Sequence, residues 1–300
     1  MFILLIVYAL FASTFVIGQA ALQYCQPVFL IAFRMCLAGV LLLSFLAIFK
    51  RKLLRFNAFN SLLFLQIILF HIYIPYVTEF WGLQFVGSAK AAILYGIMPF
   101  VTAIFEKFLF KILITKRKLI GLIIGFCGFI PILYTTSSQE QVTNTLFHIS
   151  LPELAILVSA VSSCYGWILI KKAIVYDKYS PLFSNGIGML GGGILALLTS
   201  LLVETWSPLP TSNFGMMFFY VSLVIIIGNI IYYNAHGWLL HHYSATFLSF
   251  FGFVIPLFAA FYEWLFFGEL VPWQFYLTTA MVGLGLYIFY KDELATSKLS

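Results

Sequence analysis

The sequence predicts an all-α membrane protein with ten transmembrane helices in two inverted five-helix repeats. Of its 300 residues, 63% are hydrophobic and only 9% are charged, a balance that water-soluble domains do not carry. Apolar runs of about 20 residues, long enough to cross a bilayer, recur along the chain. A β-barrel would require short alternating strands instead. The runs define ten candidate helices, at residues 2–22, 27–49, 58–83, 89–110, 116–135, 151–173, 181–203, 213–237, 244–267 and 272–290.

A pattern that occurs twice predicts the duplication. In each copy a Ser-Ala pair opens an apolar run, a proline follows, and a glutamate stands seven residues after the proline. The copies run from Ser88-Ala89 to Pro99 and Glu106, and from Ser244-Ala245 to Pro256 and Glu263. They are about 157 residues apart, and repeats of this size are a feature of secondary transporters.

Five spans separate the two copies, and an odd number inverts the second copy relative to the first. We therefore expect a first repeat at residues 1–135, an outer connection at 136–150, and an inverted second repeat at 151–300. Inverted repeats provide two interchangeable half-structures, which is the basis of alternating access.

The basic residues predict the orientation, because loops rich in Lys and Arg stay in the cytoplasm. They gather after spans two, six and ten and around the junction of spans four and five, while the alternate connections contain none. Both termini are therefore expected in the cytoplasm. This asymmetry accounts for the net charge of +6 through contacts with anionic lipid, and it requires no nucleic-acid partner.

The two prolines and two glutamates of the repeat are candidate gating or structural residues. Pro99 and Pro256 fall near the middle of their spans, where proline removes a backbone hydrogen bond and kinks a helix. At helical spacing Tyr95, Thr102 and Glu106 share the face of Pro99, which makes Tyr95 and Thr102 candidates for substrate binding. An equally weighted alternative is that each proline is simply tolerated and each glutamate lies at the membrane interface.

The order of these features resembles the drug/metabolite transporter superfamily, of the EamA type. The resemblance covers nearly the whole chain, and it is carried by small-residue, proline, glutamate and glycine positions. They are ASTFVIG at 12–18, Pro27 with Arg34, SAKAAIL at 88–94, Pro99 with Glu106, and Gly121, Gly125 and Gly128. The resemblance implies ten helices in two inverted repeats around a central cavity. The chain departs from the family after span four, where Lys111-Ile112 replaces the Gly-Glu pair that the second copy supplies as Gly268-Glu269.

Ionisable residues inside the spans are the candidates for substrate binding, because each is costly in a bilayer. Glu79 lies in span three, counting back by fours reaches His71, and Tyr76 lies one turn away on the flank. Arg34 lies in the outer third of span two and could instead pair with Glu79 structurally. For Glu79, a role in substrate binding and a structural role are equally supported by the sequence.

The second half offers Asn229, Tyr233 and His236 on one face of span eight, although a lone membrane histidine is more often a packing group. Aromatic residues make up 19% of the chain, and five of them are candidates for a lining that holds a cation or planar base. These are Tyr73, Tyr76, Trp81, Tyr95 and Trp167. Most other aromatic residues are explained by lipid contact.

The sequence therefore predicts a secondary transporter of a small organic metabolite in a bacterial inner membrane, as a monomer or homodimer contacting lipid. No enzyme motif such as HExxH or GxSxG is present, and the four cysteines have no metal or redox spacing, so no cofactor or metal is expected. Among substrates known in the resembled family, S-adenosylmethionine, with S-adenosylhomocysteine as exchange partner, is our specific expectation. The alternative is export of amino acids or amphipathic cations.

Overall fold

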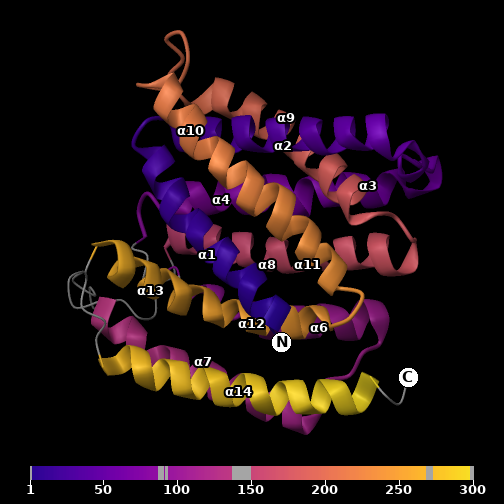
Figure 1. Ribbon diagram of the computed structural model, residues 1–300, viewed down its shortest axis with the longest axis vertical. Helices are drawn as coiled ribbons and strands as arrows, with labels where there is room; N and C mark the ends of the chain where they lie inside the picture. The colour runs from indigo at the N-terminus through magenta and orange to yellow at the C-terminus, as the bar shows by residue number, and fades with distance from the viewer. Residues whose placement is uncertain (1, 87–90, 92–93, 137–149, 268–272, 298–300) are drawn as a thin grey trace. The chain divides into compact units, whose positions relative to one another are not determined.

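The computed structural model describes residues 2–86, 91, 94–136, 150–267 and 273–297 (Figure 1). All regular elements in this part of the chain are helices, which confirms the all-α class. Six helices are long and apolar enough to cross a membrane. They are α1 (Phe2–Leu22), α2 (Pro27–Phe49), the helix Ala58–Gly82, the helix Leu151–Tyr176, α9 (Pro181–Val203) and the helix Phe214–Leu239.

These six helices follow the predicted spans closely. Large apolar side chains are exposed on the protein, for example Phe2, Phe108 and Leu202. The four other predicted spans coincide with helices that are not among these six, so the number ten stays a prediction. These are α6 (Met98–Phe110), α7 (Lys116–Thr136), α12 (Ala245–Phe251) continued by η6 (Gly252–Val254) and α13 (Ile255–Phe267), and α14 (Trp273–Ser297).

Three of the long helices contain a π-helical stretch. The helix Ala58–Gly82 consists of η2 (Ala58–Asn60), α3 (Ser61–Ile67), the π-helix η3 (Ile68–Tyr73) and α4 (Ile74–Gly82). The helix Phe214–Leu239 consists of α10 (Phe214–Val224), the π-helix η5 (Ile225–Tyr232) and α11 (Tyr233–Leu239). The third stretch, η4 (Lys172–Tyr176), continues α8 (Leu151–Lys171). Such stretches are uncommon and frequently occur at functional sites.

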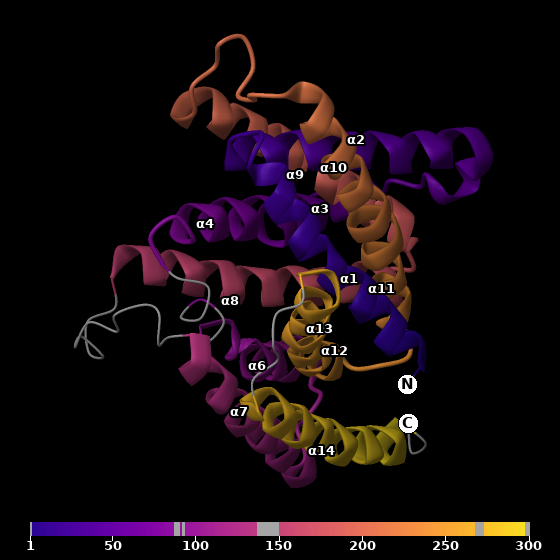
Figure 2. The same ribbon diagram turned by 60° about the vertical axis from the view of Figure 1, so that its left-hand side comes forward.

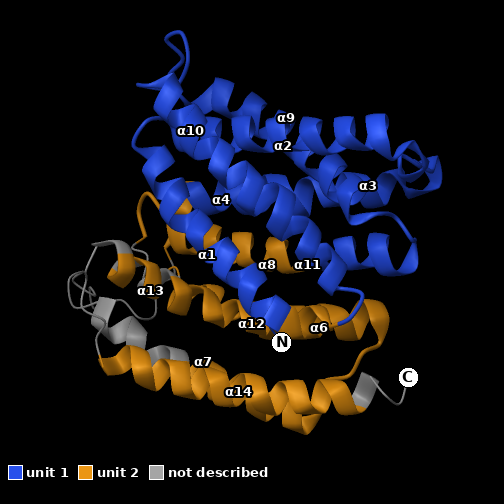
Figure 3. Ribbon diagram, in the orientation of Figure 1, with its two compact units in different colours: residues 1–80, 165–242 blue, residues 81–164, 243–300 orange. Residues whose placement is uncertain are grey.

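The chain forms two compact units, shown in Figure 3. Unit 1 contains residues 1–80 and 165–242, and unit 2 contains residues 81–164 and 243–300. Each unit therefore takes segments from both predicted repeats.

In unit 1, α2 and α9 pack along each other, as both ribbon views show (Figures 1 and 2). Both helices begin at a proline, a residue suited to the first helical turn, and Glu204 supplies the cap of α2: its carboxylate accepts hydrogen bonds from Val28 N and Phe29 N, both at 2.7 Å. A Cβ added at Gly39 would lie 2.5 Å from Leu190 N, so this glycine permits the close approach that membrane helices use in place of a hydrophobic driving force. The short η1 (Arg51–Leu53) follows α2.

In unit 2, α7 and α14 pack along each other in the same way (Figures 1 and 2). A Cβ at Gly121 would lie 2.7 Å from Gly285 O, and one at Gly285 would lie 2.6 Å from Gly121 O. The two glycines face each other across the contact. The glycine at 121, part of the family-like series, is therefore a packing residue.

The two repeat prolines stand where a helix begins again after an interruption. Pro99 is the second residue of α6, directly after a turn at Gly96 and Ile97. Pro256 is the second residue of α13, directly after η6. At such a position the missing N–H of proline costs nothing, because the first helical turn has no internal partner for it. Each segment is thus broken at its proline.

Candidate functional site

The strongest candidate site in unit 1 is a group of four ring side chains from three long helices: His71, Trp167, Tyr233 and His236. We call it the histidine–tryptophan cluster. The ring of Trp167 has its centroid 4.4 Å from that of His71, 4.0 Å from that of His236 and 5.3 Å from that of Tyr233. The His71 and Tyr233 centroids are 5.4 Å apart. Three separate helices thus converge on one indole ring.

A glycine next to Trp167 allows this convergence. A Cβ at Gly166 would lie 2.5 Å from His71 Cα and 2.6 Å from Phe70 O. Only glycine therefore lets α8 approach η3 closely enough for His71 to reach the indole ring. His71 is 2% exposed, and neither of its ring nitrogens has a hydrogen-bond partner among the described residues.

The π-helix η3 explains how His71 and Tyr76 meet the same partner. Residues five apart point in different directions on an α-helix, about 140° apart at 100° per residue. A π-helix closes i→i+5 hydrogen bonds and brings such residues nearer to one face. His71 packs on the ring of Tyr233, and the hydroxyl of Tyr76 hydrogen-bonds to the hydroxyl of Tyr233. Tyr76 therefore belongs with His71, whereas the sequence placed it on the flank.

Arg34 extends this arrangement to a charged group. Its guanidinium carbon lies 5.0 Å from the centroid of the Tyr76 ring, a cation–π distance. Its Nε is buried without a hydrogen-bond partner in the described part of the chain. Glu79, which is partly exposed, follows Tyr76 by about one helical turn in α4.

Further residues close the cluster on the side of α1. The hydroxyl of Tyr8 lies 3.4 Å from His236 Nδ1, and the ring of Tyr232 lies 5.4 Å from that of His236. Phe11 stacks on Tyr232 with a centroid distance of 3.8 Å. Aromatic rings thus surround His236 on this side of the site.

Asn229, a predicted binding residue, has a different environment. It is 1% exposed, and its amide nitrogen contacts the sulfur atoms of Met35 and Met189 at 3.2 and 3.7 Å. The structure therefore brings together His71, Tyr76, Trp167, Tyr233 and Arg34, and it places Asn229 against methionines.

In unit 2, the predicted residues Tyr95 and Thr102 both hydrogen-bond to other groups of the protein. The hydroxyl of Tyr95 lies 2.9 Å from that of Ser159, and its ring packs beside Val86, Ala91 and Ile156. Thr102 donates to Met98 O, one turn earlier in α6, at 2.8 Å. This bond occupies the hydroxyl proton of Thr102 within its own helix.

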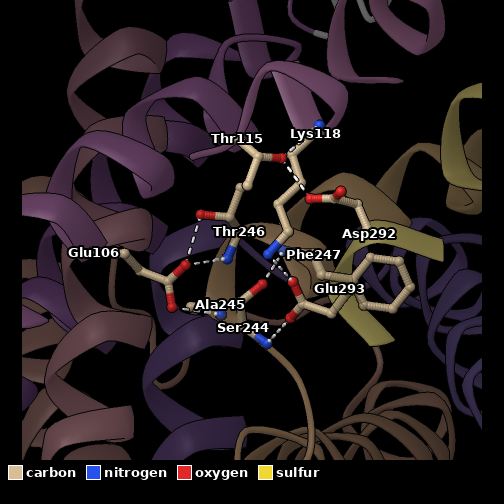
Figure 4. Close-up of polar contacts among 9 residues, drawn as sticks. All are labelled: Glu106, Thr115, Lys118, Ser244, Ala245, Thr246, Phe247, Asp292 and Glu293. Carbon is tan, nitrogen blue, oxygen red and sulfur yellow. Dashed lines mark hydrogen bonds and ion pairs between the residues drawn. The ribbon is translucent and has the colours of Figure 1, made fainter. Parts of the chain in front are cut away.

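Glu106 is the cap of a helix (Figure 4). Its carboxylate accepts hydrogen bonds from Ala245 N at 2.8 Å, from Thr246 N at 3.0 Å and from Thr246 Oγ1 at 2.7 Å. The first N–H groups of a helix have no internal partner, and the helix dipole favours a negative charge there. Glu106 is 2% exposed, so this contact is shielded from solvent. Of the two roles expected for Glu106, these contacts support the structural one.

A second carboxylate holds the same helix start. Glu293 accepts from Ser244 N at 2.7 Å and pairs with Lys118 Nζ at 2.5 Å (Figure 4). Beside it, Thr115 donates to Asp292 Oδ2 at 2.5 Å. A cavity lined by Glu106 and Lys118 measures about 10 Å³, which is room for no more than a single water molecule. This polar group therefore holds α12 in place and has no room for a metabolite.

Some predicted positions lie outside the residues or side chains that the structure describes. Glu263 lies in α13, but its side chain is not described, and Ser88, Ala89, Gly268 and Glu269 lie outside the described residues, as does nearly all of the connection 136–150. Among the described residues no group of His, Cys, Asp and Glu could hold a metal ion.

The helices and the histidine–tryptophan cluster define a multi-pass membrane protein with a polar, aromatic site inside its spans. The model of the EamA-like transporter family matches residues 1–134 and 150–291. The chain belongs to this family, within the drug/metabolite transporter superfamily, and is a transporter.

Named relatives are similar over nearly the full length. The S-adenosylmethionine/S-adenosylhomocysteine transporter of Chlamydia muridarum is 33% identical over 95% of this chain and 89% of its own. The protein of the same name from Chlamydia trachomatis serovar D is 33% identical over 95% and 86%. The uncharacterized inner membrane transporter YedA of Escherichia coli K12 is 24% identical over 94% and 90%. A crystal structure of a protein with 13% identity matches with a TM-score of 0.76 over 98% of this chain and 97% of that one, which establishes the fold alone.

Proposed function

We propose that this chain exchanges S-adenosylmethionine for S-adenosylhomocysteine across a bacterial inner membrane as a secondary transporter. The observation that carries the proposal is the histidine–tryptophan cluster, in which ring side chains from three long helices meet. His71, Tyr233 and His236 are buried there, and Trp167 is partly exposed. Buried polar groups in a bilayer are costly and mark substrate paths. The two Chlamydia relatives are named S-adenosylmethionine/S-adenosylhomocysteine transporters.

The chemistry of the substrate matches the residues around the cluster. S-adenosylmethionine has a planar base, a sulfonium cation, an ammonium and a carboxylate. Aromatic rings bind planar bases and cations, and the guanidinium of Arg34, held over Tyr76, is suited to a carboxylate. Glu79 supplies the negative charge for the ammonium. In this assignment the rings hold the base, and Arg34 and Glu79 hold the amino-acid end.

Alternating access by two inverted repeats, residues 1–135 and 151–300, is the proposed mechanism, with both termini in the cytoplasm. Two of the three π-helical stretches, η3 and η5, begin at Ile68 and Ile225, which are 157 residues apart, as are Tyr76 and Tyr233. Pro99 and Pro256 have the same separation, and each stands at a restart of its helix. The recurrence of one spacing in backbone and side chains supports the duplication.

Uptake into proteoliposomes tests the function. Labelled S-adenosylmethionine should enter vesicles that contain purified protein, and internal S-adenosylhomocysteine should accelerate its entry. Equal uptake by protein-free vesicles would remove the proposal. Saturable exchange of amino acids or amphipathic cations in place of the nucleoside would establish the alternative, an exporter of those compounds.

Glu79→Gln tests the assignment of the ammonium partner. Loss of a charged hydrogen bond is worth about 1.5–3 kcal/mol, so Kd for S-adenosylmethionine should rise about tenfold or more. Glu204→Gln is the matched control, because Glu204 caps α2 and should leave Kd unchanged in the folded protein. An unchanged Kd in Glu79→Gln would make Glu79 a packing residue.

A further inference from the structure

A chain of side-chain amides fixes the orientation of Asn185 in unit 1. Asn234 donates from Nδ2 to Ile230 O at 2.8 Å and to Asn229 O at 3.4 Å, so its Oδ1 is turned the other way. Asn185 donates from Nδ2 to that Oδ1 at 3.2 Å and to Tyr233 O at 3.1 Å. A backbone carbonyl only accepts hydrogen bonds, which determines the orientation of both amides. The remaining atom of Asn185, Oδ1, is therefore an acceptor.

This acceptor is buried and unused. Asn185 is 0% exposed, and its Oδ1 has no hydrogen-bond partner among the described residues. A buried polar atom left without a partner costs about 1–3 kcal/mol, so an unused acceptor in a membrane helix requires an explanation. Asn185 appeared among none of the residues that the sequence singled out.

The imidazole of His71 faces the side chain of Asn185, and no hydrogen bond of ordinary geometry joins them. Its ring is wedged against Trp167 and Tyr233, and both nitrogens are buried without a hydrogen-bond partner in the described part of the chain. A neutral imidazole offers one N–H donor and one acceptor nitrogen. Together the two side chains present a fixed acceptor and a donor beside an indole ring.

We propose that Asn185 and His71 form the polar edge of a purine subsite that selects a 6-amino purine over a 6-oxo purine. The inference rests on the proposed function and specifies how the base is recognised. The 6-amino group of adenine donates to Asn185 Oδ1, and the N–H of His71 donates to a ring nitrogen of the base. Trp167 and His236 supply the flat faces. A 6-oxo purine places a second acceptor against Asn185 Oδ1, and the fixed amide cannot turn to accommodate it.

The test is a ratio of two affinities. Equilibrium binding of S-adenosylhomocysteine and of S-inosylhomocysteine, its 6-oxo analogue, is measured with purified wild type, Asn185→Leu, His71→Phe and His242→Gln. His242 is exposed beyond α11 and serves as the matched control. Wild type and His242→Gln should prefer the adenine ligand about tenfold or more, because a site built for a donor rejects an analogue that lacks it. Asn185→Leu should bind the two ligands within roughly twofold of each other.

The outcomes separate the two proposals. If wild type binds neither ligand, the function and the subsite both fall. If wild type discriminates and Asn185→Leu retains the full ratio of affinities, the subsite proposal alone falls. This holds even if both affinities drop equally, which is the result expected if Asn185 contacts the ammonium that both ligands share. Asn185→Leu leaves Asn234 Oδ1 and Tyr233 O without the donor that Asn185 supplies. If this variant does not fold, His71→Phe is the deciding variant. It should bind the adenine ligand more weakly, and an unchanged affinity would overturn the assignment.

Discussion

Replacing Glu106 by glutamine should destabilise the protein without altering the substrate affinity of its folded form. Both carboxylate oxygens of Glu106 accept hydrogen bonds from the start of α12: from Ala245 N, from Thr246 N and from Thr246 Oγ1. Glutamine keeps one oxygen and turns an NH₂ group toward a buried N–H. Leaving that donor unpaired costs about 1–3 kcal/mol, and loss of the negative charge beside the helix dipole costs about 0.5–2 kcal/mol more. The expected total is about 1.5–5 kcal/mol.

The assay is equilibrium unfolding of the purified protein in detergent, with Glu204→Gln measured beside it. Glu204 caps α2 with the same chemistry, through Val28 N and Phe29 N, but it is partly exposed, and solvent will compensate part of the loss. We expect about 1 kcal/mol there. A Glu106→Gln protein within about 0.5 kcal/mol of wild type would refute the capping argument. A raised Kd in the folded variant would show instead that Glu106 acts in substrate binding or gating.

Three further predictions concern unit 1. Gly166→Ala should abolish substrate binding and lower the free energy of unfolding by about 1–3 kcal/mol, because the new Cβ would lie 2.5 Å from a backbone atom. Gly18→Ala is the control: with nothing within 4 Å of its Cβ, it should be neutral or stabilising in thermal unfolding. In a double-mutant cycle, Tyr76→Phe and Tyr233→Phe should show a coupling of about 0.5–1.5 kcal/mol, and a coupling of zero would mean that their hydroxyl contact contributes nothing. Burial, with the nearby carboxylate of Glu204 as the lesser cause, raises the pKa of Cys25 to about 12. The thiol should therefore stay protonated at neutral pH and react slowly with maleimide until strongly alkaline pH, and rapid labelling at neutral pH would contradict this.

The ends of several helices could be predicted from the sequence because the signal is local. The spans 27–49 and 181–203 match α2 and α9 at both ends, where proline opens each helix and a polar residue follows the apolar run. Length and hydropathy suffice for such elements. The interruptions at Pro99 and Pro256 are also local effects, since proline cannot continue the hydrogen-bonding of a preceding helix.

The partners of the site residues could not be predicted, because they depend on distant segments. The sequence grouped Glu106 with Tyr95 and Thr102 on one helical face, yet its carboxylate binds the start of α12, 139 residues further on. That helix start is the Ser244-Ala245 pair of the second copy. Both partners were therefore visible in the repeated pattern, and only the contact between them was hidden.

The helical geometry around His71 was hidden for a different reason. Periodicity at 100° per residue assumes an α-helix, and nothing in the sequence of residues 68–73 distinguishes the π-helix that forms there. The same assumption underlies the placing of Asn229 and Tyr233 on one helical face, because Asn229 lies within the π-helix η5, directly before Tyr233. Asn185 gave no signal at all, because its role depends on the amide of Asn234 in another helix.

Positions that the two copies share differ in character from positions where they diverge. Tyr76 and Tyr233, separated by the repeat spacing of 157 residues, carry the same side chain and hydrogen-bond to each other. At the same spacing Glu79 corresponds to His236, and His71 corresponds to Gly228. In the proposed alternating-access cycle, a symmetric pair would serve both conformations equally, because exchanging the two halves leaves it unchanged. The proposed substrate, with a base at one end and an amino acid at the other, requires asymmetry, and only the divergent positions can supply it. On this reasoning, exchanging Glu79 and His236 for each other should disturb substrate recognition while the Tyr76–Tyr233 pair and the helix packing survive.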